Sequence, residues 1–181
     1  MAIVPDDKDW TWVLERACDE CGFDPAVAQF AEIPRLVRHN VKAWLGMFES
    51  RSELATRPDD STWSPLEYAA HVRDVYRIMH ARLNLMLVLD DPEFPNWDQD
   101  VTAESQRYNA QDPEVVQRQL IRAGTAFSAA VEDVPLKDVA RKGRRGNGAA
   151  SSGFTVRTLA IYALHDPVHH LWDVTGQAFS A

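Results

Sequence analysis

Four long segments of this chain carry apolar residues at intervals of three and four positions, which is the spacing of one face of an α-helix. Strand-like alternation is scarce. We therefore predict four principal helices, at about residues 33–49, 65–89, 113–134 and 156–175. Amphipathic helices that have no sheet to cover bury their apolar faces against one another. The predicted fold class is all-α, and the predicted architecture is a four-helix bundle.

Residues typical of helix ends flank these segments. Ser64 precedes Pro65 and stands three residues before Glu67, which is the pattern of a capping box. Asp112 before a proline and Thr155 before the last segment are further N-caps, and Gly176 suits the C-terminal end of that segment. These signals predict where the helices begin and end.

The chain of 181 residues is predicted to form one domain, residues 1–181, since single domains commonly span roughly 100–200 residues. An irregular N-terminal extension at residues 1–31 precedes the first helix, and a short helix is expected within the aromatic and acidic link at 90–109. Residues 138–153 form a Gly/Ser-rich basic segment, interpreted as a flexible loop or as an anion contact. Its cationic residues are Arg141, Lys142, Arg144 and Arg145.

The charge balance bears on the class of partner. The 19 basic and 27 acidic residues give a net charge of −8, which repels phosphate backbones and anionic lipids. The longest aliphatic run, residues 85–89, is far shorter than the ~20 residues of a membrane helix, and the acidic N-terminus lacks a signal-peptide pattern. We expect a cytoplasmic protein that acts on a small molecule and binds neither nucleic acid nor membrane.

The two cysteines, Cys18 and Cys21, stand in a Cys-x-x-Cys-Gly sequence. This spacing is consistent with an incidental structural pair, with half of a metal site completed from elsewhere, or with a redox pair. Because the pair precedes the first helix by more than ten residues, we expect it to lie outside the bundle and apart from the histidines.

Two of the six histidines share one helix face. His165 and His169 are four residues apart and lie within about 40° of each other, whereas His170 is turned by about 140° from His165. The HExxH motif of zinc proteases is absent. His71 lies on the apolar stripe of the second helix, so three histidines face the bundle interior. Three imidazoles suit a transition metal and leave positions open for water or substrate.

Two carboxylates are candidates for orienting the His71 ring. Glu67 and Asp74 lie four residues before and three residues after it, within reach on the helix. The other interpretation of Asp74 is a surface charge paired with Arg73 or Arg77.

Two motifs carry a resemblance to a known family. The run Trp63–Asp74 (WSPLEYAAHVRD) and the run His165–His170 (HDPVHH) are similar to the histidine motifs of the DinB superfamily, and the likeness extends over nearly the whole chain. The head CDECGFD and the link FPNWD resemble an actinobacterial subgroup. The resemblance implies an up-down-down-up bundle, often dimeric, with zinc or nickel held by His71, His165 and His169.

The resemblance also implies a type of chemistry. Some members of the superfamily are transferases and isomerases that use a low-molecular-weight thiol such as mycothiol or bacillithiol. We therefore expect a metal-dependent thiol transferase or isomerase, with the basic segment as an anion contact. The alternative is a non-catalytic metal-binding protein of stress response or interaction.

Overall fold

The computed structural model describes residue 3, residues 8–146 and residues 152–180. Its helices are α1 (Ile33–Ser50), α2 (Pro65–Val88), α3 (Gln99–Ser105), α4 (Pro113–Glu132) and α5 (Val156–Thr175). Its strands are β1 (Glu93–Phe94), β2 (Lys142–Arg145) and β3 (Ser152–Thr155). The four long helices and the short α3 confirm the predicted all-α class.

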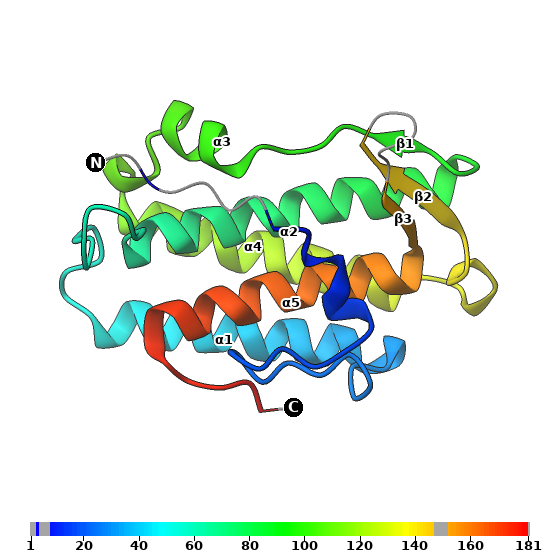
Figure 1. Cartoon of the computed structure of the whole chain (residues 1–181), viewed down its shortest axis with the longest axis horizontal. Coiled ribbons are helices and arrows are strands. Elements are labelled where there is room, and N and C mark those ends of the chain that lie inside the picture. The colour runs from blue at the N-terminus through cyan, green and yellow to red at the C-terminus, as the bar shows by residue number, and fades with distance from the viewer. Residues whose placement is uncertain (1–2, 4–7, 147–151, 181) are drawn as a thin grey trace.

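The four long helices pack as a bundle (Figure 1). Helices α2 and α4 run in one direction, and α1 and α5 run in the opposite direction, which is the up-down-down-up order. Helix α2 packs against α4 and α5, and α1 packs against the same two helices from the other side. None of the described helices is both long enough and apolar enough to span a bilayer.

The predicted cap residues begin and end these helices. Ser64 accepts a hydrogen bond from the Glu67 backbone N–H, and the Glu67 carboxylate accepts one from the Ser64 backbone N–H, so the capping box is complete. Asp112 and Thr155 cap α4 and α5 through their side chains. Gly176 ends α5 at a φ of 71°, a left-handed conformation that glycine adopts without a steric cost.

The core lies between the four long helices and contains a polar link. Trp44 and Tyr76 are fully buried. The Trp44 indole N–H and the Asn40 amide both donate to the carbonyl of Pro167 in α5, at 3.1 and 3.2 Å, and the Tyr76 hydroxyl donates to Asn40 Oδ1 at 2.9 Å. These bonds connect α1 and α2 to the middle of α5. They help to set the rotation of α5 about its own axis, which decides where its histidines point.

A small sheet lies at one end of the bundle (Figure 1). Strand β2 pairs in parallel with β1 and antiparallel with β3. Residues 138–153, expected as a flexible loop, therefore contribute β2 and the first residues of β3, while residues 147–151 lie outside the described part. The short strands carry no alternating apolar pattern, so their pairing could not be seen in the sequence.

The N-terminal extension packs along α5 (Figure 1). It contains two 3₁₀ helices, Trp10–Leu14 and Phe30–Glu32, separated by an irregular segment. Cys18 and Cys21 in this segment are buried, with 1% and 0% of their surfaces exposed. The extension therefore covers α5 and brings both cysteines against it.

Candidate functional site

Helix α5 supplies most of the site. His165 and His169 are one turn apart on one face, and Asp166 and His170 are one turn apart on a face rotated by about 100°. The two pairs belong to two groups of potential metal-binding side chains. We call Cys18, Cys21, His165 and His169 the cysteine cluster, and His71, Asp166 and His170 the His71 cluster.

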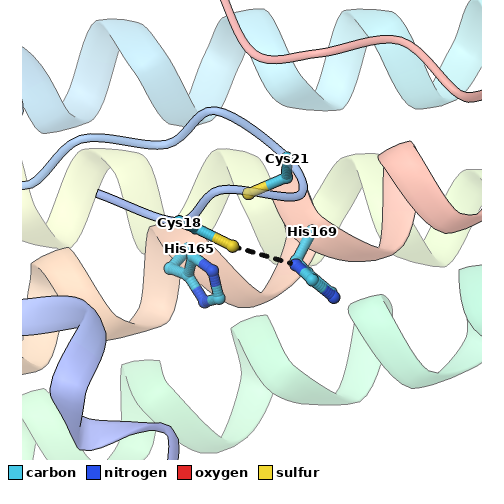
Figure 2. A group of neighbouring side chains, drawn as sticks. All are labelled: Cys18, Cys21, His165 and His169. Atoms are coloured by element: carbon cyan, nitrogen blue, oxygen red, sulfur yellow. Dashed lines mark hydrogen bonds between the residues drawn. The ribbon is translucent and has the colours of Figure 1, made fainter. Parts of the chain in front are cut away.

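The cysteine cluster joins the N-terminal extension to α5. Figure 2 shows both cysteines on the extension and both histidines on α5, with the four side chains converging. One potential ligand atom from each residue lies within 4.8 Å of all the others, and all four residues are buried. Cys18 Sγ is 3.6 Å from His169 Nδ1, and the other ring nitrogen of His169 lies 3.6 Å from a Glu20 carboxylate oxygen.

Backbone hydrogen bonds shape the turn that carries the cysteines. The Cys18 N–H donates to the Phe23 carbonyl at 2.8 Å, and the Gly22 N–H donates to the Cys18 carbonyl at 2.9 Å. Gly22 has a φ of 74°, which closes the turn behind the two sulfur atoms. The Phe179 N–H donates to the Cys21 carbonyl at 2.7 Å, so the C-terminal tail holds this turn from outside.

The His71 cluster joins α2 to the second face of α5. Asp166 Oδ1 is 3.2 Å from His71 Nε2 and 3.7 Å from His170 Nε2. His170 Nδ1 lies 2.8 Å from Asp173 Oδ2, which turns the opposite nitrogen of the ring toward Asp166. Two imidazole nitrogens and one carboxylate oxygen therefore face one point.

The His71 ring is enclosed by aromatic side chains. It is fully buried, stacks on Trp97 at a centroid distance of 5.2 Å and an interplanar angle of 6°, and lies 5.3 Å from the Trp63 ring. Its Nδ1 atom is buried without a hydrogen-bond partner among the described residues. The ring is thus held by packing, and the hydrogen bond that it makes within the described part of the chain points into the cluster.

Burial sets the protonation states of the two clusters. It lowers the pKa of His71 and of His169, and it lowers the pKa of His165 to about 4, helped there by the neighbouring His169. Burial alone would raise the pKa of Asp166, but His71 and His170 more than offset that effect, and the pKa is lowered. Neutral imidazoles beside a carboxylate are the forms that bind metal ions.

The Cys21 thiol differs from a reactive thiol. Burial raises the pKa of Cys21 to about 12, although the backbone N–H of Phe23 acts in the opposite direction. A thiol that stays protonated is a poor nucleophile and a poor partner for disulfide exchange. The surroundings of Cys21 therefore disfavour redox chemistry at that thiol, whereas a bound cation would displace its proton.

A cavity of about 550 Å³ opens beside both clusters. Asp166, His165, His169 and His170 form part of its lining. Its walls also include aromatic and cationic side chains, namely Trp10, Trp97, Tyr162, Arg82 and Arg145. The cavity combines potential metal ligands with groups that can bind an anionic or aromatic small molecule.

The ligand set predicted from the sequence is divided between the two clusters. His71 lies in the His71 cluster, and His165 and His169 lie in the cysteine cluster. Cys18 and Cys21 were expected apart from the histidines, but their sulfur atoms lie within 4.8 Å of the histidine ring nitrogens, because the extension folds back along α5. His170 was expected to point away from the face of α5 that carries His165, and the structure places it in the other cluster. The metal-binding role of each of these residues stays a prediction.

The two carboxylates expected near His71 have other partners. Glu67 accepts hydrogen bonds from Arg57 and from the Ser64 N–H. Asp74 accepts from Arg73 at 2.6 Å, from the Tyr108 hydroxyl at 2.7 Å and from Arg77 at 2.9 Å. The ring nitrogens of His71 are not among these partners.

The basic residues of the 138–153 segment also separate. Arg141 donates to the carbonyls of Met86 and Leu89 and so caps the C-terminal end of α2, and Arg144 pairs with Asp91. Arg145 lines the cavity and donates to the Tyr162 hydroxyl at 3.0 Å. Of the four cationic residues of this segment, Arg145 is the one that lines the cavity, and its role as an anion contact stays a prediction.

Sequence reasoning missed Asp166 and His170, which complete the His71 cluster, and Asp173, which holds His170. The available signal was a second pair at a spacing of four residues, offset by one position from His165 and His169. Predicting which of the two pairs lies beside His71 requires knowing which face of α5 packs against α2. That depends on how the four helices pack together.

The chain was compared with known proteins. The sequence profile of the DinB superfamily matches residues 29–174. Curated protein sequences contain no match. A structure from Bacillus subtilis, YfiT, described as a probable metal-dependent hydrolase with an unusual four-helix bundle topology, aligns with a TM-score of 0.73 and 17% identity. The alignment covers 83% of this chain and 86% of that one. The histidine-bearing bundle and the profile match together show that this chain belongs to the DinB superfamily.

Proposed function

We propose that this chain is a metal-dependent enzyme that activates a nucleophile at the His71 cluster. The observation that carries the proposal is the convergence of His71 Nε2, Asp166 Oδ1 and His170 Nε2 beside a cavity of about 550 Å³. Two imidazoles and one carboxylate are a common ligand set of catalytic zinc and related metals, and they leave coordination positions open. We propose zinc or nickel as the metal.

A divalent ion held there would act as a Lewis acid that lowers the pKa of a nucleophile reaching its open position. The protein contributes the surroundings of that position. Asp173 orients His170 through the 2.8 Å contact, and Trp97 stacks on His71 and keeps water from that side of the ring. These contacts hold two ligands in place before a substrate arrives.

We propose a low-molecular-weight thiol, mycothiol or bacillithiol, as the nucleophile. The cavity wall supports an electrophile that carries a carboxylate, because Arg145 lines the cavity, is mostly buried and packs on Tyr162 and Phe154. Its ion-pair partner there is the exposed Asp9, at 3.9 Å, which a bound carboxylate would replace. A guanidinium in this setting can bind a carboxylate through two hydrogen bonds. Arg145 would thus hold a carboxylate-bearing electrophile while the thiol attacks it.

Hydrolysis is a second candidate. The observation that favours it is the shared fold with the Bacillus subtilis protein described as a probable metal-dependent hydrolase. Water would then be the nucleophile at the same three ligands. The two candidate reactions use the same site and differ in the nucleophile, which is a thiol in one and water in the other.

The test is a comparison of two activities in zinc-loaded and nickel-loaded protein. Conjugation of mycothiol or bacillithiol to an α,β-unsaturated carboxylic acid is measured beside hydrolysis of a chromogenic ester. We expect metal-dependent conjugation that falls to the uncatalysed rate in His170→Ala and in Asp166→Asn. The matched control is His39→Ala, which alters an exposed histidine on α1.

Arg145→Gln provides a separate measurement. It should raise the KM for the carboxylate-bearing electrophile, with a smaller change for its methyl ester. Ester hydrolysis without conjugation would contradict the thiol reaction and support the hydrolase as the function of this site. Metal binding at the His71 cluster without either activity would favour the non-catalytic alternative.

A further inference from the structure

The cysteine cluster lies partly outside the matched family region. Cys18 and Cys21 precede residue 29, where the profile match begins, whereas His165 and His169 belong to α5 within it. Cys18 and His169 are 151 positions apart in the chain, and yet their side chains are 3.6 Å apart. Four buried side chains with sulfur and nitrogen ligand atoms thus meet at a place that the proposed catalysis does not use.

We propose that Cys18, Cys21, His165 and His169 bind one Zn²⁺ ion as a structural site that fastens the N-terminal extension to α5. Two thiolates and two imidazoles form a complete tetrahedral set for zinc, as in structural sites that are closed to solvent. Because four protein ligands fill a tetrahedral coordination shell, the set leaves no position for a substrate, although His165 and His169 also line the cavity.

One pair of the ligand atoms has the separation that zinc requires. Zn–S bonds of about 2.3 Å and Zn–N bonds of about 2.0 Å place a sulfur and a nitrogen about 3.5 Å apart around a tetrahedral ion. The 3.6 Å between Cys18 Sγ and His169 Nδ1 agrees with this separation. The Cys-x-x-Cys turn closed by Gly22 also matches the ligand spacing of structural zinc sites.

An unpartnered atom points independently to a ligand. His165 has 3% of its surface exposed, and its Nε2 atom is buried without a hydrogen-bond partner among the described residues. Leaving such an atom unpaired is unfavourable, and coordination of a cation would remove that cost. His169 uses Nδ1 toward Cys18, and its Nε2 lies 3.6 Å from Glu20 and 3.8 Å from Asp173, which suits a zinc-bound ring oriented by carboxylates.

The site would also stabilise one wall of the cavity. The Trp10 ring packs on His169 at a centroid distance of 4.8 Å and on His165 at 5.6 Å, and Trp10 lines the cavity. An ion that holds the extension on α5 therefore holds Trp10 beside the His71 cluster. This role does not depend on whether the His71 cluster is catalytic.

The test uses cobalt as a spectroscopic substitute for zinc. Wild-type protein loaded with Co²⁺ should show a thiolate-to-cobalt charge-transfer band in the near ultraviolet, and Zn²⁺ should abolish it by displacement. Cys18→Ser/Cys21→Ser should lose the band and one equivalent of bound metal. His71→Ala/His170→Ala should keep the band, and His39→Ala serves as the control for surface histidines.

Each variant is checked for helical content by circular dichroism. The main result, the charge-transfer band of the wild-type protein, does not depend on whether any variant folds. Absence of the band in metal-loaded wild-type protein would overturn the proposal, and so would a Cys18–Cys21 disulfide in freshly purified protein kept under reducing conditions. Loss of the band in helical His71→Ala/His170→Ala would assign the thiolates to a shared site instead. The band reports thiolate binding to the metal and does not depend on activity. A protein without the proposed catalysis should therefore still show it, so the two proposals are tested separately.

Discussion

Asp173 contacts both clusters with its two carboxylate oxygens. Its Oδ2 lies 2.8 Å from His170 Nδ1, and its Oδ1 lies 3.8 Å from His169 Nε2. A carboxylate in this position selects the tautomer of His170 that presents its Nε2 lone pair to Asp166. At the scale of single residues, Asp173 therefore decides which nitrogen His170 offers to a metal.

We expect Asp173→Ala to weaken metal binding at the His71 cluster about 10–100-fold, the usual effect of losing a carboxylate that orients a ligand. The measurement is competition with a chromogenic chelator in the Cys18→Ser/Cys21→Ser background, where the cysteine cluster cannot contribute. Asp133→Asn, an exposed aspartate at the end of α4, is the control. Unchanged affinity in Asp173→Ala would show that packing alone orients His170.

Asp74 is a stabilising group, because three donors bind its buried carboxylate. Asp74→Asn should lower the free energy of unfolding by about 2–3 kcal/mol at pH 7, since it leaves the buried Arg73 without its ion pair. Metal affinity should not change. Chemical denaturation of metal-free protein and a chelator competition measure the two quantities, with the exposed Glu114→Gln as the control for stability.

The pH dependence of this effect follows from the pKa of Asp74. Burial alone would raise that pKa, but the bonds from Arg73 and Tyr108 more than offset it, so the pKa is lowered on folding. A group with a lowered pKa contributes its full stabilisation above its unfolded value of about 3.9, and the contribution is lost as the pH falls through the folded value. The difference between wild type and Asp74→Asn should therefore shrink in acid. If the difference in the free energy of unfolding stayed constant at pH values well below the folded pKa of Asp74, the ionised carboxylate would not be the source of the stabilisation.

At the scale of elements, two helical glycines have opposite surroundings. A Cβ atom at Gly124 of α4 would overlap the Val41 side chain of α1 and lie 3.3 Å from Tyr76 of α2, whereas one at Gly46 of α1 would meet nothing within 4 Å. Gly124 therefore permits the close approach of α4 to both helices. Gly46 makes no such contact, and its effect is to make α1 less stable as a helix than it would be with alanine at this position.

Gly124→Ala should destabilise the protein by about 1–3 kcal/mol, because overpacking outweighs the gain in helix propensity. Gly46→Ala should stabilise it by about 0.5–1 kcal/mol, because only the gain in propensity remains. Denaturation curves of the two variants against wild type measure both. Stabilisation of both variants would show that α4 can shift without cost.

The helices were predictable because their signals are local. The capping residues Ser64, Asp112 and Thr155 and the apolar spacing specify where each helix begins and which residues it buries, and the structure confirms these starts. The strands were not predictable, because β2 and β3 are stabilised by pairing with each other and with β1 rather than by a pattern of their own.

At the scale of the whole molecule, Cys18 and Cys21 belong to the hydrophobic core, but most of that core consists of apolar residues that are not proposed metal ligands. Chelation should leave the far-ultraviolet circular dichroism spectrum nearly unchanged, because the apolar contacts of α1, α2, α4 and α5 remain. Saturation of one site at 1,000 times its Kd stabilises a protein by about 4 kcal/mol, so loss of the metal from one of the two sites should lower the Tm by about 10 °C. Loss of helical structure on chelation would show that metal binding and folding are coupled.

The sequence by itself determined the helices, their amphipathic faces and the two pairs of residues spaced four apart on α5. Helical geometry relates residues of one helix to one another without reference to the rest of the chain. The tertiary structure alone decided that His71 meets Asp166 and His170, and that the cysteines meet His165 and His169. The rotation of α5 results from packing and from hydrogen bonds such as those of Asn40 and Trp44 to Pro167, which join residues more than a hundred positions apart. No local pattern records which neighbour will face each side of a helix.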